Sequence, residues 1–315
     1  MTNDQKELFH NMITGKILID EPMHKHTTFG IGGPASALIY PKNKNELKLL
    51  LKKAKNELIP IFFAGSGTNL LVSDKGFDGI VVSLAKSFKQ LEIQDSLKIT
   101  AEAGVMLGHM VKEAIKRGIG GLEGLVGVPG TVGGALVMNA GAYGGEISNY
   151  LISTTVITHS GKEKMYYKED IDFEYRYSNF KKDEIIVETC FQCRPGDLEK
   201  IKHNKKVSSD KRKSSQPLTI RSAGSIFKNP KDGQPAGYLI DNVGLKGTKC
   251  GDAEISLKHA NFIVNHGNAT STDVINLIKL IRKTVQEKFN ILLDLEIKLL
   301  GFEKEFQESN FYAHS

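Results

Sequence analysis

Apolar and polar positions follow two different periods in the N-terminal part of the chain. Apolar side chains recur at helical spacing in 45–58 and 106–117, and Gly118 stands where the second helix is expected to end. Short β-type runs accompany them at 59–64, 79–84 and 97–101. Helices and strands are therefore expected to alternate in this part of the protein.

The rest of the chain shows strand patterns first and a long helix near the end. Strands are predicted at 150–158, 164–167 and 185–193. A helix is expected at 197–207, and the basic, Ser-rich segment 205–215 has few apolar anchors. Apolar residues share one helical face in 272–288. In 290–300 they alternate with polar residues, which places Asp294, Glu296 and Lys298 on the other face of a predicted strand.

The most informative stretch, 123–147, is dense in glycine. Gly serves where the backbone needs a positive φ or must approach a ligand closely, and successive N–H groups in such conformations form anion-binding nests. A second run, GSGTN at 65–69, follows a predicted strand. Two such loops indicate a ligand with an extended anionic part, such as the diphosphate of a dinucleotide. The alternative is ordinary turns, which fits the longer run less well because Gly weakens helices and strands.

This dinucleotide site is not expected to be a Rossmann unit or a P-loop. A Rossmann fingerprint requires G-x-G-x-x-G between a strand and a helix, whereas Leu70 stands at the last glycine position. No Gly-Lys-Ser/Thr follows either glycine run, so the Walker A motif is absent as well.

Composition places the protein among globular proteins of two or three domains. Of its 315 residues, 40% are hydrophobic and 25% are charged, and the net charge is +6. No stretch approaches the ~18 apolar residues of a membrane-spanning helix, and the polar N-terminus has no secretory signal. The three Cys and the missing signal indicate a reducing, cytoplasmic location. Because the positive charge is spread along the chain, we expect neither a nucleic-acid partner nor membrane insertion.

Cys190 and Cys193 form a C-x-x-C pair. A redox pair needs this motif at a helix N-terminus, but here it closes a β-type run, which disfavours a redox or metal-binding role. The sequence has no second Cys pair and no His pair at metal spacing, so no metal site is predicted.

Several motifs together resemble the family of UDP-N-acetylenolpyruvoylglucosamine reductases, the flavoenzymes of the second committed step toward muramic acid in peptidoglycan synthesis. They cover nearly the whole chain in the family's order, and their joint occurrence is specific although each glycine motif alone is not. The matching segments are Thr27-Thr28-Phe29, Ile31-Gly32-Gly33, GSGTNLLVSDKGFDGIVV from Gly65, GVPGTVGGALVMNAGAYGGE from Gly127, Tyr175-Arg176-Tyr177-Ser178, AGSIFKNP from Ala223, HANFIVN from His259 and LEIKLLG from Leu295.

The resemblance implies an α+β fold in three parts. Residues 1–88 and 89–205 would form the two subdomains of an FAD-binding domain of the vanillyl-alcohol-oxidase (PCMH) type. Residues 206–315 would form a C-terminal α+β domain that binds the UDP-sugar substrate. The spacing before AGSIFKNP is similar to that of the shorter, second type of the enzyme. Gly30 and Ser36 depart from the family pattern, in which a basic residue and Asp are common, and the tail 302–315 lies beyond the matched region.

The reaction implied by the resemblance is the NADPH-dependent reduction of UDP-N-acetylglucosamine enolpyruvate to UDP-N-acetylmuramate through non-covalently bound FAD. It belongs to peptidoglycan synthesis, and so to cell shape, the cell cycle and cell division. By resemblance, Arg176 holds the substrate carboxylate, Ser225 donates a proton and Glu296 helps with the enol intermediate. The residue pattern alone would make Ser225 a turn residue, Glu296 a solvent-facing strand residue and Arg176 a surface residue on a Tyr-rich strand. A monomer is expected.

The resemblance also assigns ligand contacts. The residues expected to bind FAD lie in the two glycine runs and are Gly65, Ser66, Gly67, Thr68, Asn69, Gly127, Val128, Pro129, Gly130, Thr131, Gly133, Gly134, Asn139, Gly141, Ala142, Tyr143 and Gly144. Tyr175, Lys213 and Asn229 are expected to contact the substrate, the last two at its diphosphate. His259 and Asn261 could contact substrate too, but structural roles in the core are favoured for both.

Two other functions remain as alternatives. The first is an FAD-dependent oxidase of the same fold that uses O₂. Covalent oxidases commonly present a His or Cys to the flavin, and His26 is the only nearby candidate here. The second is a non-catalytic flavin- or nucleotide-binding module, which the joint presence of Arg176, Ser225 and Glu296 argues against.

Overall fold

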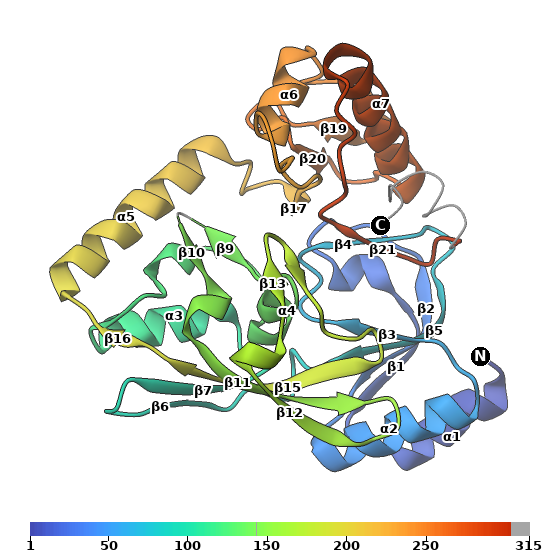
Figure 1. Ribbon diagram of the computed structural model, residues 1–315. Helices are drawn as coiled ribbons and strands as arrows, with labels where there is room; N and C mark the ends of the chain where they lie inside the picture. Colours follow the sequence, from blue (N-terminus) through green and yellow to red (C-terminus); the bar gives the residue numbers. More distant parts are fainter. Residues whose placement is uncertain (143, 304–315) are drawn as a thin grey trace. The chain divides into compact units, whose positions relative to one another are not determined.

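The computed structural model describes residues 1–142 and 144–303, which form two compact units interleaved in sequence (Figure 1). Unit 1 comprises 1–19, 36–66 and 79–212, and unit 2 comprises 20–35, 67–78 and the chain from 213 onward. Each unit has a hydrophobic core of its own. The functional division into two FAD-binding subdomains and a substrate domain stays a prediction.

A four-stranded sheet begins unit 1, in the order β1-β2-β5-β3. Strands β3 and β5 run parallel, and Ile61 pairs with Ile80. Helix α2 turns its predicted apolar face, Leu47, Leu50 and Leu51, into the core. The elements are α1 (Asn3–Met12), β1 (Lys16–Pro22), β2 (Pro34–Tyr40), α2 (Lys44–Asn56), β3 (Ile61–Ala64) and β5 (Phe77–Ser83).

A five-stranded antiparallel sheet, β12-β11-β15-β7-β6, forms the second part of unit 1. Helices α3 and α4 lie over this sheet (Figure 1). Its strands and the neighbouring elements are β6 (Leu91–Ile93), β7 (Lys98–Glu102), α3 (Leu107–Lys116), β8 (Ile119–Gly120), η2 (Glu123–Leu125), α4 (Val132–Val137), β9 (Gly141–Ala142), β10 (Gly145–Glu146), η3 (Ile147–Tyr150), β11 (Leu151–Thr158), β12 (Glu163–Tyr167), η4 (Lys168–Asp170), β13 (Phe173–Glu174), β14 (Tyr177–Ser178), β15 (Glu184–Gln192), β16 (Arg194–Pro195) and α5 (Leu198–Ser215).

Unit 2 combines an antiparallel sheet, β17-β20-β19-β18, with helices α6 and α7 and with a separate parallel pair of β4 and β21. Val274, Ile278 and Ile281 on α7 are fully buried in its core. The elements are η1 (Met23–His26), β4 (Leu70–Val72), β17 (Arg221–Ser225), α6 (Ala236–Asn242), β18 (Lys249–Cys250), β19 (Ala253–Ile255), β20 (Phe262–Asn265), α7 (Ser271–Phe289) and β21 (Lys298–Leu300).

Helix α7 is held at its N-terminus by residues that are distant in sequence. Thr270 and Asp273 form a capping box. The carboxylate of Asp74 accepts further hydrogen bonds from the N–H and Oγ of Ser271, both at 2.8 Å, and from the N–H of Thr272 at 3.3 Å. A carboxylate at this end also complements the helix dipole. Asp74 therefore joins the segment after β4 to the long helix of unit 2.

Most predicted elements are confirmed within one or two residues, and the differences have physical reasons. The helix expected at 197–207 continues to Ser215, although among its residues only Ile201 and Ser208 are buried. In 290–300 the predicted alternation is present as burial, but only Lys298–Leu300 is hydrogen-bonded as a strand. Helix α1 was not predicted, because Phe9 is its one buried residue.

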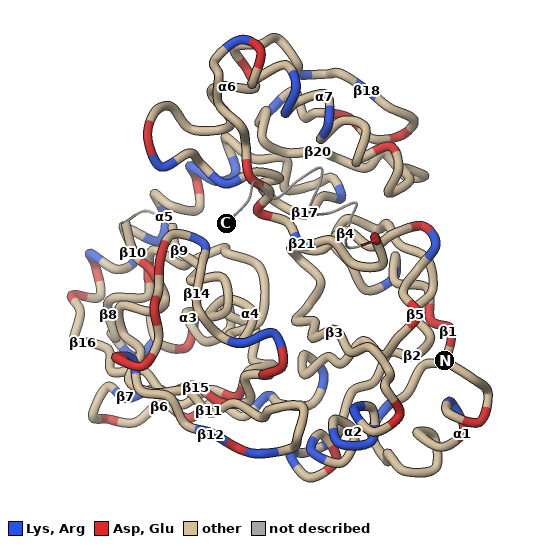
Figure 2. The backbone as a smooth tube through the Cα atoms, turned by 45° about the vertical axis from the view of Figure 1, so that its right-hand side comes forward, with Lys and Arg blue, Asp and Glu red and all other residues tan. Residues whose placement is uncertain are grey.

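Lys and Arg are distributed over many elements of both units, interspersed with Asp and Glu (Figure 2). None of the helices in the described residues has the length and apolarity needed to cross a membrane. Within 1–142 and 144–303, no three His, Cys, Asp or Glu side chains are grouped so that they could hold a metal ion.

The C-x-x-C pair lies at the end of β15, as the sequence indicates. Cys193 is buried in the core of unit 1. Burial, together with the negative charge of Glu123, raises the pKa of the Cys193 thiol to about 12. The thiolate is the reactive form of cysteine, so this environment disfavours a redox role for the pair.

Replacing Asp74 with Ala should lower the free energy of unfolding by about 1–2 kcal/mol, because the N-terminus of α7 loses its distant acceptor. Urea denaturation followed by circular dichroism measures this. Glu287→Ala is the matched control on the same helix, since Glu287 is exposed and pairs with the exposed Lys283 at 3.9 Å. Equal effects of the two variants would contradict the assigned role of Asp74.

Iodoacetamide at pH 8 should alkylate Cys193 roughly 10³-fold more slowly in the folded protein than in the urea-unfolded chain, because a thiol with a pKa of about 12 is almost entirely protonated there. Peptide mass spectrometry over time gives both rates. Labelling of folded Cys193 at the unfolded rate would show that the thiol is accessible and ionised.

Candidate functional site

The two predicted glycine loops meet within unit 1. Gly65 follows β3, and Thr131 is the N-cap of α4. A Cβ atom at Gly65 would lie 2.8 Å from Thr131 Oγ1, a distance that real Cβ contacts do not show. The carbonyl of Gly65 also accepts a hydrogen bond from Ser83 Oγ at 3.0 Å. The first loop therefore needs glycine here so that its backbone can approach the second loop.

Two buried polar atoms in these loops have no hydrogen-bond partner among the described residues, Ser66 Oγ and Asn139 Oδ1. Leaving a buried polar group unsatisfied costs about 1–3 kcal/mol, so such atoms are rare without a reason. Asn139 is fully buried and has a left-handed backbone with φ 40°. The residues present therefore fit a bound nucleotide cofactor, whose polar groups would satisfy both atoms.

Not every glycine of the long run serves a ligand. A Cβ at Gly133 would lie 2.8 Å from Ala103 Cβ, and the N–H of Gly133 donates to the carbonyl of Ala103 at 3.0 Å. Gly141 is packed equally closely against Glu146. Gly144, with φ 82°, has no described atom within 4 Å of a built Cβ. Some of these glycines thus permit close packing, and the contact predicted for Tyr143 lies outside the described residues.

Arg176 lies at the tip of a hairpin in unit 1 rather than on a strand. Strands β13 and β14 pair Glu174 with Tyr177 and leave Tyr175 and Arg176 as the turn. Arg176 has a left-handed φ of 55°, and its guanidinium lies 5.0 Å from the centre of the Tyr175 ring. A non-glycine residue in this conformation stores strain, which is common at functional sites. On the following strand, Ser178 Oγ donates to the carbonyl of Val137 at 2.6 Å.

In unit 2, Ser225 and Glu296 lie on neighbouring segments. Ser225 ends β17, where the register with β20 shifts between Ser222 and Ser225. Such a bulge re-aims side chains and is frequent beside active sites. The next residue, Ile226, accepts a hydrogen bond from the N–H of Glu296 at 2.8 Å. The structure therefore brings these two predicted catalytic residues together, while Arg176 belongs to unit 1.

The first glycine loop continues into unit 2, where it is tied to β17. The N–H of Thr28 donates to the carbonyl of Gly67 at 3.1 Å, and Thr28 Oγ1 donates to the carbonyl of Ser222 at 2.8 Å. A Cβ at Gly67 would lie 2.0 Å from the carbonyl oxygen of His26, so this glycine is required for packing. The Thr27-Thr28-Phe29 motif thus connects the loop to the strand that carries Ser225.

The residues predicted to contact substrate have identifiable local surroundings. Lys213 is exposed near the end of α5, and its carbonyl accepts a hydrogen bond from Lys258 Nζ at 2.5 Å. Asn229 Oδ1 accepts from the N–H of Ala236, the first residue of α6, at 3.1 Å. Part of the Asn229 amide therefore fixes local structure, and its contact with substrate stays a prediction.

Asn261 has the structural role that the sequence favours. Its side chain is buried and bonds both polar backbone groups of Phe227, accepting from the N–H at 2.9 Å and donating to the carbonyl at 2.8 Å. Burial lowers the pKa of the neighbouring His259 below its ordinary value. Asn261 therefore braces the segment that follows Ser225.

Gly30, one of the two departures from the family pattern, lies in unit 2 with φ 67°. The side chain of Arg221 covers it, since a Cβ there would lie 2.5 Å from Arg221 Nη1. A side chain at position 30 would therefore displace this guanidinium as well as strain the backbone.

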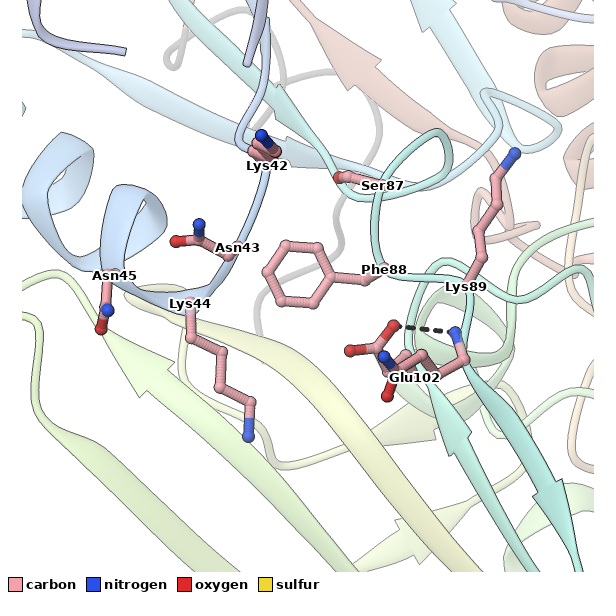
Figure 3. A pocket seen from close by; sticks show the side chains of 9 residues that line it. Lys42, Asn43, Lys44, Asn45, Ser87, Phe88, Lys89 and Glu102 are labelled. Atoms are coloured by element: carbon pink, nitrogen blue, oxygen red, sulfur yellow. Dashed lines mark hydrogen bonds between the residues drawn. The ribbon is translucent and has the colours of Figure 1, made fainter. Parts of the chain in front are cut away.

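A pocket of about 580 Å³ lies elsewhere in unit 1 (Figure 3). Within it Glu102 accepts the N–H of Gln90 at 2.8 Å, and Lys44 is paired with Glu163 at 3.1 Å. Its lining residues are Lys42, Asn43, Lys44, Asn45, Ser87, Phe88, Lys89, Gln90 and Glu102. None of these was predicted to bind FAD or substrate or to act in catalysis.

Comparison with known proteins identifies the two parts of the chain. Residues 35–164 match the FAD binding domain family, and residues 216–300 match the family described as UDP-N-acetylenolpyruvoylglucosamine reductase, C-terminal domain. These matches, with the observed sheets and helices, confirm the predicted α+β fold with an FAD-binding part and a different C-terminal domain.

Relatives that match over nearly their whole length are named UDP-N-acetylenolpyruvoylglucosamine reductase. The UDP-N-acetylenolpyruvoylglucosamine reductase of Caldanaerobacter subterraneus subsp. tengcongensis is 43% identical over 91% of this chain and 94% of its own. That of Syntrophus aciditrophicus is 42% identical over 94% and 96%. The crystal structure of the Thermus caldophilus enzyme superposes with a TM-score of 0.78 at 37% identity, covering 91% of this chain and 99% of that one. The chain therefore belongs to the UDP-N-acetylenolpyruvoylglucosamine reductase family and is an FAD-containing oxidoreductase.

Proposed function

We propose that the protein reduces the enolpyruvyl group of UDP-N-acetylglucosamine enolpyruvate to give UDP-N-acetylmuramate, with NADPH as hydride donor, in peptidoglycan synthesis. The names of its relatives support this proposal, and so does one structural observation. Ser225 and Glu296 lie on neighbouring segments that are joined by the Glu296 N–H to Ile226 carbonyl bond. The proposal includes a cytoplasmic location, a monomer, and separate FAD-binding and substrate-binding domains.

The reaction adds a hydride to C3 of the enolpyruvyl group and a proton to C2. FAD, when bound, would supply the hydride that it receives from NADPH. The residues of the two glycine loops would hold it, with Ser66 Oγ and Asn139 Oδ1 as unsatisfied polar atoms suited to its polar groups. The chain must then stabilise the negative charge that develops at C2 and on the adjacent carboxylate, and provide one proton.

Arg176 is proposed to hold that carboxylate. A guanidinium binds a carboxylate through two parallel hydrogen bonds and keeps its charge at any physiological pH. The tight turn between β13 and β14 sets the direction in which the Arg176 side chain leaves the backbone. Such a restriction suits a group that must meet a carboxylate with defined geometry.

Ser225 is proposed to donate the proton to C2, with Glu296 stabilising the enol form. A serine hydroxyl is a weak acid, but a carbanion or enolate at C2 is a stronger base than an alkoxide, so the transfer is feasible when the geometry is fixed. The bulge beside Ser225 and the bond to Glu296 provide fixed backbone positions for both side chains. Lys213, Asn229 and Tyr175 are proposed to bind the UDP-sugar.

The purified protein should be yellow and should release its FAD on denaturation. NADPH alone should bleach the flavin absorbance, and UDP-N-acetylglucosamine enolpyruvate should then restore it without oxygen. Anaerobic absorbance spectra measure each step. Restoration by O₂ but never by the sugar nucleotide would favour an oxidase. Flavin that stays attached to the denatured chain would exclude non-covalent binding.

Ser225→Ala should separate the two halves of the reaction. Reduction by NADPH should continue near the normal rate, whereas transfer to the sugar nucleotide should slow by ~10²–10⁴-fold, the usual contribution of a positioned proton donor. Stopped-flow absorbance resolves both steps. Ser222→Ala, on the same strand β17, is the control and should leave both rates nearly unchanged. A Ser225→Ala variant that is slow only in the NADPH step would disprove the assigned role.

A further inference from the structure

We propose that Asn69 and Asn139, the asparagines of the two glycine loops, are positioning residues for Glu296 and Arg176. Each side-chain amide holds the backbone of a segment that carries one of these proposed catalytic residues. The inference rests on the proposed function for the roles of Glu296 and Arg176, and it goes beyond the cofactor contacts expected of the two loops.

Asn69 acts directly on the backbone of Glu296. Its Nδ2 donates to the carbonyl of Glu296 at 3.0 Å, and its own carbonyl accepts from the N–H of Lys298 at 2.9 Å. On the other side, the N–H of Glu296 donates to Ile226 at 2.8 Å. Both polar backbone groups of Glu296 are therefore engaged, one toward the strand of Ser225 and one toward the glycine loop. With its peptide groups held in this way, the side chain leaves a defined point in a defined direction.

The Asn69 amide takes the place of a missing strand partner. The parallel pairing of β4 with β21 begins at Leu70 and Lys298, so the carbonyl of Glu296 lies just before the ladder. A backbone acceptor without a partner is costly, and a short side-chain amide can extend the hydrogen bonding by one position. Asp at this site could not donate, because an ionised carboxylate only accepts.

Asn139 holds the hairpin of Arg176 in an analogous way. Its Nδ2 donates to the carbonyl of Glu174 at 3.1 Å and to Glu146 Oε2 at 2.8 Å. Glu174 is the last residue of β13, directly before the Tyr175–Arg176 turn. The bond from Ser178 Oγ to Val137 fastens the second strand to the same stretch of chain. Each strand of this hairpin has only two residues, and both strands are thus anchored beside the second glycine loop.

The backbone conformation of Asn139 fits this role. Its φ of 40° is left-handed, a conformation that Asn tolerates better than most residues. Both Nδ2 hydrogens go to the chain, while Oδ1 is the buried atom without a partner. One side chain therefore serves the hairpin through its nitrogen and leaves its oxygen for the cofactor.

Hydrogen exchange of the protein without substrate tests the hydrogen bonds from Asn69 and Asn139 independently of activity. Asn69→Leu keeps the shape of the side chain and removes the donor, so amide exchange in 294–300 should become about 3- to 10-fold faster, in line with the loss of one hydrogen bond. Asn139→Gly, which suits a positive φ, should have the same effect in 173–178. Asn268→Leu and Asn149→Leu change exposed asparagines of units 2 and 1 and serve as controls.

Stopped-flow kinetics tests whether these hydrogen bonds matter for the reaction. In FAD-loaded Asn69→Leu, transfer to the sugar nucleotide should slow by about 3- to 10-fold more than reduction by NADPH does. Asn69→Gln retains a donor on a longer arm and should recover part of the loss. In Asn139→Asp, which loses both Nδ2 donors to Glu174 and Glu146, exchange in 173–178 should rise with or without FAD.

Unchanged exchange in 294–300 and 173–178, or a loss of FAD as the only effect, would overturn the positioning roles. Equal slowing of both half-reactions would do the same, because a general structural defect acts on both. These outcomes are distinct from a failure of the proposed function, in which the unaltered protein would not transfer hydride to the sugar nucleotide at all. In that case the exchange measurements would still decide whether Asn69 and Asn139 hold the segments 294–300 and 173–178.

Discussion

Backbone N–H and C=O groups that leave a sheet or helix must find other hydrogen-bond partners, and this requirement governs both units of the protein. The segments that carry the proposed catalytic residues are short or irregular. The two strands of the Arg176 hairpin have two residues each, β17 is interrupted by a bulge, and β21 begins only at Lys298. Side chains therefore supply the partners that regular pairing does not.

Asparagine side chains provide many of these hydrogen-bond partners. Asn261 bonds both polar groups of Phe227, Asn265 donates to the carbonyl of Phe29 at 2.9 Å, and Asn69 and Asn139 bond Glu296 and Glu174. A side-chain amide resembles a peptide group, since it offers a donor and an acceptor at similar distances. It can thus continue a hydrogen-bonding pattern across a gap in the main chain, which a carboxylate or an ammonium group cannot do.

Within the glycine motifs, glycine and asparagine therefore have different structural roles. Glycine permits close approach, as at Gly65 beside Thr131 and at Gly133 beside Ala103. The asparagine in the same motif then joins the loop to a distant segment. A sequence motif that predicts a ligand-binding loop therefore also connects distant segments of the chain. Its residues cannot all be counted as ligand contacts.

The periodic elements of the fold could be predicted from the sequence because their periods reflect burial. Helices α2, α3 and α7 have long apolar faces, and all of them were expected close to their observed bounds. Helix α1 and the second half of α5 have almost no buried face, so no hydrophobic signal marks them. In 290–300 the alternating burial was correct, but hydrogen bonding also depends on a partner strand, which pattern alone does not reveal.

The candidate site was less accessible to such reasoning. Ser225 and Glu296 become neighbours only through tertiary pairing, and their residue types in isolation indicate a turn and an exposed strand position. Their proposed roles come from the family resemblance. The left-handed φ of Arg176 and the amide bonds of Asn69 and Asn139 are likewise properties of the folded chain, and local sequence does not encode them in a readable form.

Strain and unsatisfied polarity coincide in the part of unit 1 where the cofactor is expected. Arg176 and Asn139 both have left-handed backbones, which cost of order 1–3 kcal/mol each for non-glycine residues. Ser66 Oγ and Asn139 Oδ1 are buried without partners in the described chain. A ligand that satisfies these atoms binds the folded protein and not the unfolded one, so its binding free energy adds to stability. Because Asn139 also holds the hairpin of Arg176, the same ligand would restrict the motion of a proposed catalytic residue, and cofactor binding and catalytic geometry would then be coupled through one side chain.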